Sequence, residues 1–129
     1  MARVVQKFGG TSVADIACIQ AAAAKVKAEF DRGNEVAVVV SAMAGMTNDL
    51  VDKTIAIAPL HDVREYDTVV AAGEQVTAGL LALALQKEGV DARSWLGWQI
   101  PIRTDDAHGK ARIQGMETDE LRRRMANGQ

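Results

Sequence analysis

Hydrophobic positions near the N-terminus change from strand-like spacing to helical spacing and back. Residues 4–8 contain two valines and a phenylalanine, and residues 36–40 are an unbroken apolar run rich in valine, which is typical of strands. Between them, apolar residues recur at helical spacing at Ile16, Ile19, Ala23, Val26 and Phe30. This pattern predicts a helix over residues 13–31. Because residues 36–40 do not alternate with polar residues, both faces of that strand should be covered, as in a parallel sheet. Together these elements predict a βαβ unit and the α/β class.

The remainder of the chain predicts further helices and short strands. The expected helices cover residues 49–58, 62–71, 75–87 and a last one that Thr118 caps, and the expected strands cover residues 92–98 and 110–114. Capping-box spacing marks two helix starts, at Ser12 with Asp15 and at Asp62 with Glu65. The helix at 75–87 is apolar nearly all round, which predicts that it is buried or forms an interface.

Composition narrows the classes of protein and partner. The 129 residues suit a single domain, and a net charge of −2 with 4% aromatic residues argues against nucleic-acid binding. No apolar run approaches the ~20 residues of a membrane span, and the N-terminus leads directly into a strand. A lone Cys18 cannot form an internal disulfide. We therefore expect a cytoplasmic protein without a membrane segment or signal peptide. His108 has no partner at ligand spacing, so no metal site is expected.

A lysine and two adjacent glycines follow the first predicted strand. Gly9 and Gly10 carry no side chain that would keep a ligand away from the backbone. The following helix should turn its free N–H groups and the positive end of its dipole toward this corner. Lys7 adds a positive charge, so the corner suits a phosphoryl group. The alternative is that the glycines only allow a tight turn, since the pattern matches neither a P-loop nor a dinucleotide fingerprint.

Two further stretches place polar side chains where ligands bind in open α/β sheets. Ser41 and Thr47 follow the carboxyl end of the second predicted strand. Alternatively, Thr47 or Asn48 simply caps the next helix. Glu74 stands at the start of the apolar helix, where it suits either the helix dipole or the ammonium group of a substrate.

Four motifs resemble those of the bacterial aspartate kinases (aspartokinases), in the same order and at the same spacing. They are Lys7-Phe8-Gly9-Gly10-Thr11-Ser12-Val13, Val40-Ser41-Ala42-Met43 with Thr47-Asn48, Gly73-Glu74, and Thr104 with His108-Gly109-Lys110-Ala111-Arg112-Ile113. The resemblance extends over the whole chain.

This resemblance implies the amino acid kinase (carbamate kinase-like) fold, a largely parallel sheet between helices. It also implies transfer of the γ-phosphoryl group of ATP, with Mg²⁺, to the side-chain carboxylate of L-aspartate. The product, 4-phospho-L-aspartate, begins the lysine, threonine and methionine biosynthesis of this family. By resemblance, Lys7 is catalytic and the ATP phosphates bind at Lys7, Phe8, Gly9, Gly10, Thr11 and Ser12. The implied substrate-binding residues are Ser41, Thr47, Glu74 and Thr104, with Glu74 pairing the α-ammonium group of aspartate.

Other family features are not found in this sequence. The GRGGSD-type motif, the adenine-binding half and the ACT domains are missing, so residues 1–129 resemble only the N-terminal, substrate-side half of the kinase domain. We expect an open sheet edge and no useful aspartate phosphorylation by these residues alone. The resemblance also implies a homo-oligomer without a tightly bound cofactor.

Two other functions remain open at this point. The chain could be a non-catalytic binding or assembly module with the same half-fold, which the apolar helix at 75–87 favours. It could also be another amino acid kinase that acts on a different carboxylate or on carbamate. Ser41-Ala42-Met43 with Thr47-Asn48, and Glu74 after Gly73, favour aspartate.

Overall fold

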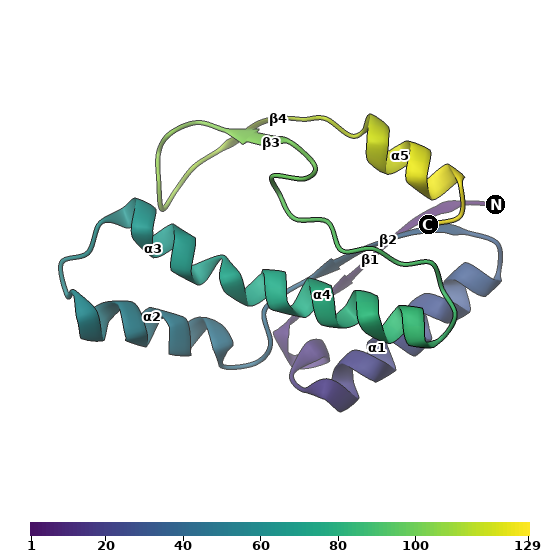
Figure 1. Cartoon of the computed structure of the whole chain (residues 1–129), viewed down its shortest axis with the longest axis horizontal. Coiled ribbons are helices and arrows are strands. Elements are labelled where there is room, and N and C mark those ends of the chain that lie inside the picture. The colour runs from purple at the N-terminus through teal and green to yellow at the C-terminus, as the bar shows by residue number, and fades with distance from the viewer.

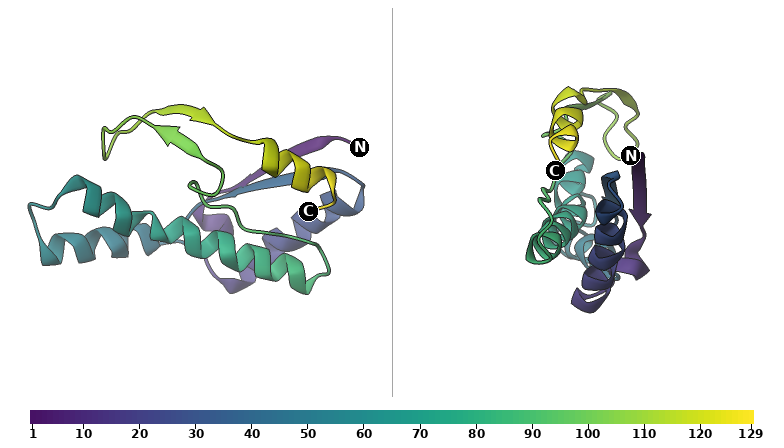
Figure 2. Two further views of the ribbon diagram at one scale, coloured as in Figure 1. Left: turned by 45° about the horizontal axis from the view of Figure 1, so that its top comes forward. Right: turned by 90° about the vertical axis from the view of Figure 1, so that its right-hand side faces the viewer.

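The computed structural model describes residues 1–129 and contains a two-stranded parallel sheet, helices packed beside it and a separate two-stranded hairpin. In chain order the elements are β1 (Arg3–Phe8), the 3-10 turn η1 (Gly10–Val13), α1 (Ile16–Asp31), β2 (Glu35–Val40), α2 (Met46–Ile57), α3 (Val63–Val70), α4 (Ala72–Lys87), β3 (Ile102–Thr104), β4 (Ile113–Met116) and α5 (Asp119–Ala126). Figure 1 shows α2 and α3 extending as a pair to one side, with the hairpin above them. Figure 1 and the left view of Figure 2 place the two termini at one end of the molecule.

The first βαβ unit forms as the sequence predicts. β1 and β2 are parallel, with Arg3 opposite Glu35 and Phe8 opposite Val40. One face of this sheet packs against a core that α1 and α4 share. The core cluster consists of Val13, Ile19, Ala22, Ala23, Val26, Leu81, Leu85 and Val90. Fully burying one Val, Ile or Leu side chain contributes about 1.5–3 kcal/mol, so this cluster holds α1 to α4. The predicted stripe of α1 is confirmed except at Ile16, which is 54% exposed.

The opposite face of the sheet is open, so the expectation that both faces of β2 are covered is wrong. Val5 is 66% exposed and Val39 is 52% exposed. Val5 pairs with Ala37 and Val39 pairs with Lys7, so these four side chains share one face. The apolar residues of this face are those of a buried sheet, but no helix of residues 1–129 covers them.

The start of α1 differs from the predicted capping box. A 3-10 turn, η1, follows the glycines, and α1 begins only at Ile16. Asp15 is the N-cap residue, and its carboxylate accepts the N–H of Cys18 at 2.8 Å. Ser12 therefore does not cap the helix. The hydrogen bond from the Cys18 backbone holds the pKa of the Asp15 carboxyl below its ordinary value of 3.8.

Replacing Asp15 with alanine should make the melting temperature lower at pH 7, because the cap hydrogen bond is lost. The lowered pKa means that the carboxylate stabilises the fold fully above pH 3.8 and loses this contribution as the pH falls through its folded-state pKa. The difference in melting temperature between the two proteins should therefore shrink below pH 3.8. Thermal melts of both proteins, followed by circular dichroism from pH 7 to pH 3, measure this difference in melting temperature. A difference that stays constant with pH would contradict the role of the Asp15 carboxylate as the N-cap of α1.

Helices α3 and α4 form one nearly continuous helical stretch. α3 begins as predicted, because the Asp62 carboxylate accepts backbone N–H groups of its first turn. Ala71, between the two helices, has helical backbone angles, so residues Val63–Lys87 run for 25 residues. By length and composition alone this stretch could span a membrane, with 22% of its apolar window buried. The expectation that no apolar run approaches that length is therefore wrong. Core helices of soluble proteins pass the same test, and α4 places Leu81 and Leu85 in the core.

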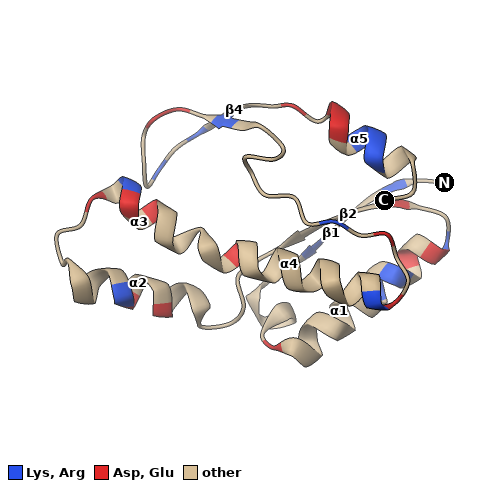
Figure 3. Cartoon of the chain, in the orientation of Figure 1, with Lys and Arg blue, Asp and Glu red and all other residues tan.

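The outer side of α4 is exposed, although the helix was expected to be buried or at an interface. Leu83 is 62% exposed and Val76 is 45% exposed. Figure 3 shows that α4 carries few charged residues, in contrast to α5. The helix is therefore not fully buried, and an interface on its exposed side stays a prediction.

The strand predicted at residues 92–98 does not form. Residues 91–96 follow α4 without regular secondary structure, and a turn continues to Pro101. A strand needs a neighbour to pair with, and β2 pairs only with β1. The strand pattern in the sequence is present, but no strand of residues 1–129 lies next to it.

Residues 102–116 form an antiparallel hairpin that the sequence analysis did not predict. Its second strand, β4, lies at Ile113–Met116 instead of 110–114. The hairpin tip is fixed to α3, because the Asp67 carboxylate accepts the N–H of Gly109 at 2.8 Å and lies 3.4 Å from Nδ1 of His108. Thr118 occupies the N-cap position of α5, but its side chain makes no capping hydrogen bond.

Candidate active site at the carboxyl ends of β1 and β2

The carboxyl ends of β1 and β2 bring the first two motifs together. Because Phe8 pairs with Val40, the residues that follow each strand are neighbours. Ser41 continues the pairing by donating its N–H to the Phe8 carbonyl at 3.1 Å. The glycine turn and the Ser41 stretch therefore meet at one edge of the sheet.

Lys7 lies over this glycine turn. Its Nζ is 3.8 Å from the position that a Cβ atom would occupy at Gly9. Lys7 is exposed and makes no salt bridge, and Gly9 donates no hydrogen bond within the chain. A cation therefore lies beside a turn in which the Gly9 N–H has no partner within the chain, which suits an anion.

The helix dipole contributes less to this corner than the sequence predicts. The first regular helix after the glycines begins at Ile16, and its N-cap position is already occupied by the Asp15 carboxylate. Between them, Thr11 and Ser12 are exposed in η1, and Ser12 donates its N–H to the Gly9 carbonyl at 2.9 Å. An anion at this corner would interact mainly with Lys7 and the glycine amides, because the Asp15 carboxylate screens the α1 dipole.

Ala42 is the point at which three motifs make contact. A Cβ atom at Gly10 would lie 3.2 Å from the Ala42 carbonyl oxygen, and one at Gly73 would lie 2.9 Å from Ala42 Cβ. Ala42 is 5% exposed and donates its N–H to Oε1 of Glu74 at 3.4 Å. Close packing against Ala42 therefore favours glycine at both positions. The sequence analysis treated Ala42 only as part of a motif and did not predict these contacts. The one indication in the sequence is that a small residue stands between Ser41 and Met43.

Glu74 has hydrogen-bonding capacity beyond this contact. An ionised carboxylate offers about four acceptor sites, and the Ala42 N–H uses one of them. No lysine, arginine or histidine forms a salt bridge with Glu74. Its remaining acceptors are therefore available to a cationic group.

Thr47 lies in the first turn of α2 with its side chain exposed. The helix begins at Met46, after Gly45 with a φ of 79°, and no side chain caps it. The alternative that Thr47 or Asn48 caps this helix is therefore wrong, because the left-handed Gly45 occupies the N-cap position. The Thr47 hydroxyl makes no hydrogen bond within the chain and can contact a ligand.

Thr104 is not brought together with the other candidate residues. It lies on β3, and its Oγ1 donates to the Asp105 carbonyl at 2.8 Å. Figures 1 and 2 show the hairpin apart from the carboxyl ends of β1 and β2. Phe8 is half-buried and packs against the core, so only its backbone reaches the glycine turn.

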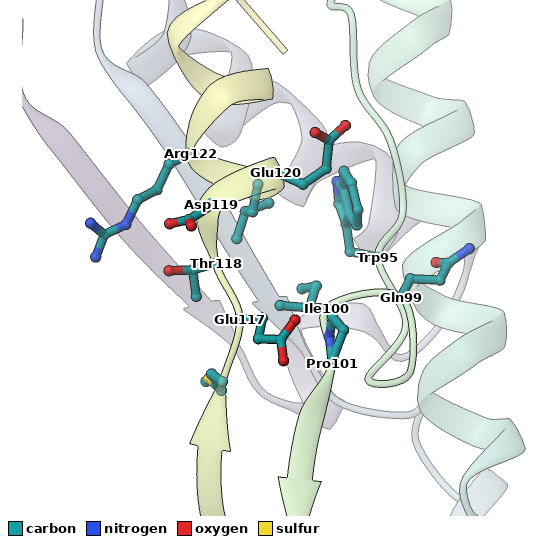
Figure 4. A pocket seen from close by; sticks show the side chains of 11 residues that line it. Trp95, Gln99, Ile100, Pro101, Glu117, Thr118, Asp119, Glu120 and Arg122 are labelled. Carbon is teal, nitrogen blue, oxygen red and sulfur yellow. The ribbon is translucent and has the colours of Figure 1, made fainter.

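A hollow elsewhere in the chain contains none of the candidate residues. It has a volume of about 740 Å³ and lies between the start of α5 and the turn at residues 99–101, with Trp95 on its wall (Figure 4). Its acidic residues are partly neutralised, since Glu120 pairs with Arg123 and Arg124, which lower the pKa of its carboxyl. No group of three or more His, Cys, Asp or Glu side chains is arranged to hold a metal ion.

Comparison with known proteins identifies the family. The sequence profile of the amino acid kinase family matches residues 2–129. The chain belongs to the amino acid kinase family. It is 51% identical to the aspartokinase of Rickettsia felis over 124 residues, which cover 94% of this chain and 31% of that protein. It is 48% identical to aspartokinase 2 of Bacillus subtilis over 128 residues, covering 99% of this chain and 31% of that protein.

Solved structures of this family share the fold. The aspartate kinase of Synechocystis matches 65% of this chain and 14% of its own with a TM-score of 0.64 and 49% identity. Aspartokinase III of E. coli, in complex with aspartate and ADP, matches 96% of this chain and 38% of its own with a TM-score of 0.79 and 24% identity. The amino acid kinase fold and the resemblance to aspartokinases are therefore confirmed. The chain spans about a third of the length of the curated relatives described above.

Proposed function

We propose that residues 1–129 form the aspartate-binding and phosphoryl-receiving part of an aspartate kinase. In this reaction the γ-phosphoryl group of ATP is transferred to the side-chain carboxylate of L-aspartate, which gives 4-phospho-L-aspartate and ADP. The observation that carries the proposal is the convergence of three motifs on Ala42, next to an unpaired Lys7. Aspartokinases are also the relatives that match 94–99% of the chain at about half identity.

Lys7 and the glycine amides suit the phosphoryl group. Phosphoryl transfer depends on positioning and on neutralising the charge of the transferred oxygens, so a free cation beside bare amides is the required chemistry. Lys7 is the proposed catalytic residue, and the ATP phosphates would contact the turn formed by Gly9 and Gly10. Mg²⁺ would enter with ATP. No carboxylate cluster near Lys7 offers it a site of its own.

Glu74, Ser41 and Thr47 suit the amino acid. Glu74 has free acceptors for the α-ammonium group of L-aspartate, which distinguishes an amino acid from a plain dicarboxylate. The hydroxyl groups of Ser41 and Thr47 follow the same sheet edge and can donate to substrate oxygens. Thr104 remains a proposal that rests on the family motif alone.

Calorimetric titration tests this function. L-Aspartate should bind to the 129-residue chain, whereas L-glutamate and MgATP should not, because the proposed residues suit a short amino acid and none of them would contact a nucleoside. A coupled ADP-release assay should show no aspartate-dependent turnover by this chain. Binding of glutamate or carbamate with indifference to aspartate would favour another amino acid kinase instead.

The second candidate function is a non-catalytic assembly module. The open sheet face with Val5 and Val39, together with the exposed Leu83 of α4, favours it. Light scattering distinguishes the two functions when combined with titration. A defined oligomer that binds none of the three ligands would support the module and contradict the kinase proposal.

A further inference from the structure

Thr77 is the only buried residue of the chain with a polar side chain. It lies in the second turn of α4 and is 0% exposed, so its hydroxyl group has no contact with solvent. The hydroxyl donates to the Gly73 carbonyl oxygen at 3.2 Å. Valine has nearly the same shape and needs no hydrogen-bond partner, whereas a buried hydroxyl is costly unless it is bonded. The bond to Gly73 is therefore the feature that distinguishes threonine from valine at this position.

This bond acts on the backbone directly before Glu74. The Gly73 carbonyl and the Glu74 N–H belong to the same peptide group, which is planar, so a bond that orients the carbonyl also orients the start of Glu74. Glycine is the least restricted residue inside a helix. Two contacts restrict Gly73, namely the Thr77 hydroxyl on its carbonyl oxygen and the Ala42 methyl group, 2.9 Å from where a Cβ atom would lie. Thr77 and Ala42 therefore hold the two sides of one glycine.

The Glu74 carboxylate depends on this support because its own contact is long. Its Oε1 accepts the Ala42 N–H at 3.4 Å. Typical N–H···O bonds measure about 2.7–3.2 Å, so a small displacement of the Glu74 backbone is enough to break this one. Neither a salt bridge nor a second hydrogen bond holds the carboxylate in place. Its position is consequently set by the backbone that carries it.

We propose that Thr77 is a positioning residue, which holds the Glu74 carboxylate beside the Ala42 N–H, where it can receive an ammonium group. Thr77 itself contacts no substrate, because it is fully buried, and it acts through the Gly73–Glu74 peptide group. The consequence for L-aspartate rests on the proposed function. The effect on the carboxylate does not, and it can be measured without a ligand.

Two substitutions of Thr77 separate positioning from packing. Thr77→Val keeps the shape of the side chain and removes the hydroxyl, whereas Thr77→Ser keeps the hydroxyl and removes a buried methyl group. The serine variant should therefore have the lower melting temperature of the two. Calorimetric titration should show wild-type affinity for L-aspartate in Thr77→Ser. Thr77→Val should bind L-aspartate about 3- to 10-fold more weakly, the usual effect of one neutral hydrogen bond, with succinate binding unchanged.

Thr68→Val is the matched control. The Thr68 hydroxyl donates to the Arg64 carbonyl, also four residues earlier, at 3.0 Å on the exposed surface of α3. Its removal deletes the same kind of bond at a place that does not adjoin Glu74. We therefore expect no change in the affinity for L-aspartate or succinate.

Amide hydrogen exchange of Ala42, followed by NMR in the free chain, measures the contact with Glu74 directly. The Ala42 N–H should exchange about 3- to 10-fold faster in Thr77→Val and at the wild-type rate in Thr77→Ser and Thr68→Val. Because the serine variant is the less stable one, lost stability does not explain such a result. Unchanged Ala42 exchange in Thr77→Val would overturn the proposal, as would equal losses of L-aspartate and succinate affinity. Faster exchange in a protein whose wild type binds no L-aspartate would support the positioning role and contradict the proposed function alone.

Discussion

Replacing Glu74 with glutamine should weaken L-aspartate binding by about 10- to 100-fold. Hydrogen bonds to charged groups contribute about 1.5–3 kcal/mol, and 1.4 kcal/mol corresponds to a factor of ten in affinity. The substitution keeps the size of the side chain and its carbonyl oxygen, so the bond from the Ala42 N–H at 3.4 Å can persist. The variant therefore tests the negative charge of Glu74 separately from its place in the fold.

Titration calorimetry with L-aspartate measures this effect, with Glu88→Gln as the matched control. Glu88 is an exposed glutamate at the opposite end of α4 and makes no salt bridge. The Glu88→Gln substitution should leave the dissociation constant for L-aspartate unchanged. Succinate, which lacks the ammonium group, should bind to the wild-type and Glu74→Gln chains with similar affinity. An aspartate affinity that is unaffected by Glu74→Gln would remove Glu74 from substrate recognition.

Sequence pattern predicts the elements whose partners lie nearby in the chain. The first βαβ unit is of this kind, because its strands and the helix between them occur within the first 40 residues and pack on one another. The start of α3 at Asp62 is equally local, since the capping carboxylate and the backbone N–H donors that it accepts are two or three residues apart. Such features need no knowledge of the tertiary structure.

Features that depend on distant partners were predicted poorly. The segment at 92–98 has the composition of a strand, but its strand state depends on a neighbour that residues 1–129 do not provide. The position of the hairpin depends on Asp67, which is 42 residues from Gly109 in sequence. The start of α1 was misplaced because Ser12 and Asp15 have ideal capping-box spacing, while the close approach of Gly10 to Ala42 favours the 3-10 turn instead.

The candidate site was predicted in its members but not in its geometry. Lys7, Ser41 and Glu74 were singled out, and the structure places the stretches that carry them around one sheet edge. Their convergence on Ala42 could not be predicted, because it arises from packing between α4 and the loop after β2. Thr104 shows the opposite case, since its motif matches the family but its position on the hairpin is set by contacts with α3.

Replacing Gly73 with alanine should lower the free energy of unfolding by about 1–3 kcal/mol, the usual cost of overpacking a tight contact. The new Cβ atom would lie 2.9 Å from Ala42 Cβ, and both atoms belong to short side chains that cannot rotate away. Gly79→Ala is the matched control in the same helix, because a Cβ atom there has no neighbour within 4 Å. This control should raise the free energy of unfolding by about 0.5–1 kcal/mol through helix propensity.

The double variant Gly73→Ala with Ala42→Gly should recover most of the lost stability, because it removes the atom that the new methyl group meets. Urea unfolding of the two single variants and the double variant forms a double-mutant cycle, with an expected coupling energy of about 1–2 kcal/mol. Strictly additive effects would show that Gly73 is needed for another reason.

Because Glu74 follows Gly73 directly, this same contact sets the distance from its carboxylate to the Ala42 N–H. Gly73→Ala should therefore also weaken L-aspartate binding, and the double variant should restore it, whereas Gly79→Ala should leave it unchanged. Parallel recovery of stability and affinity would tie the packing of α4 against Ala42 to the position of the proposed ammonium-binding carboxylate.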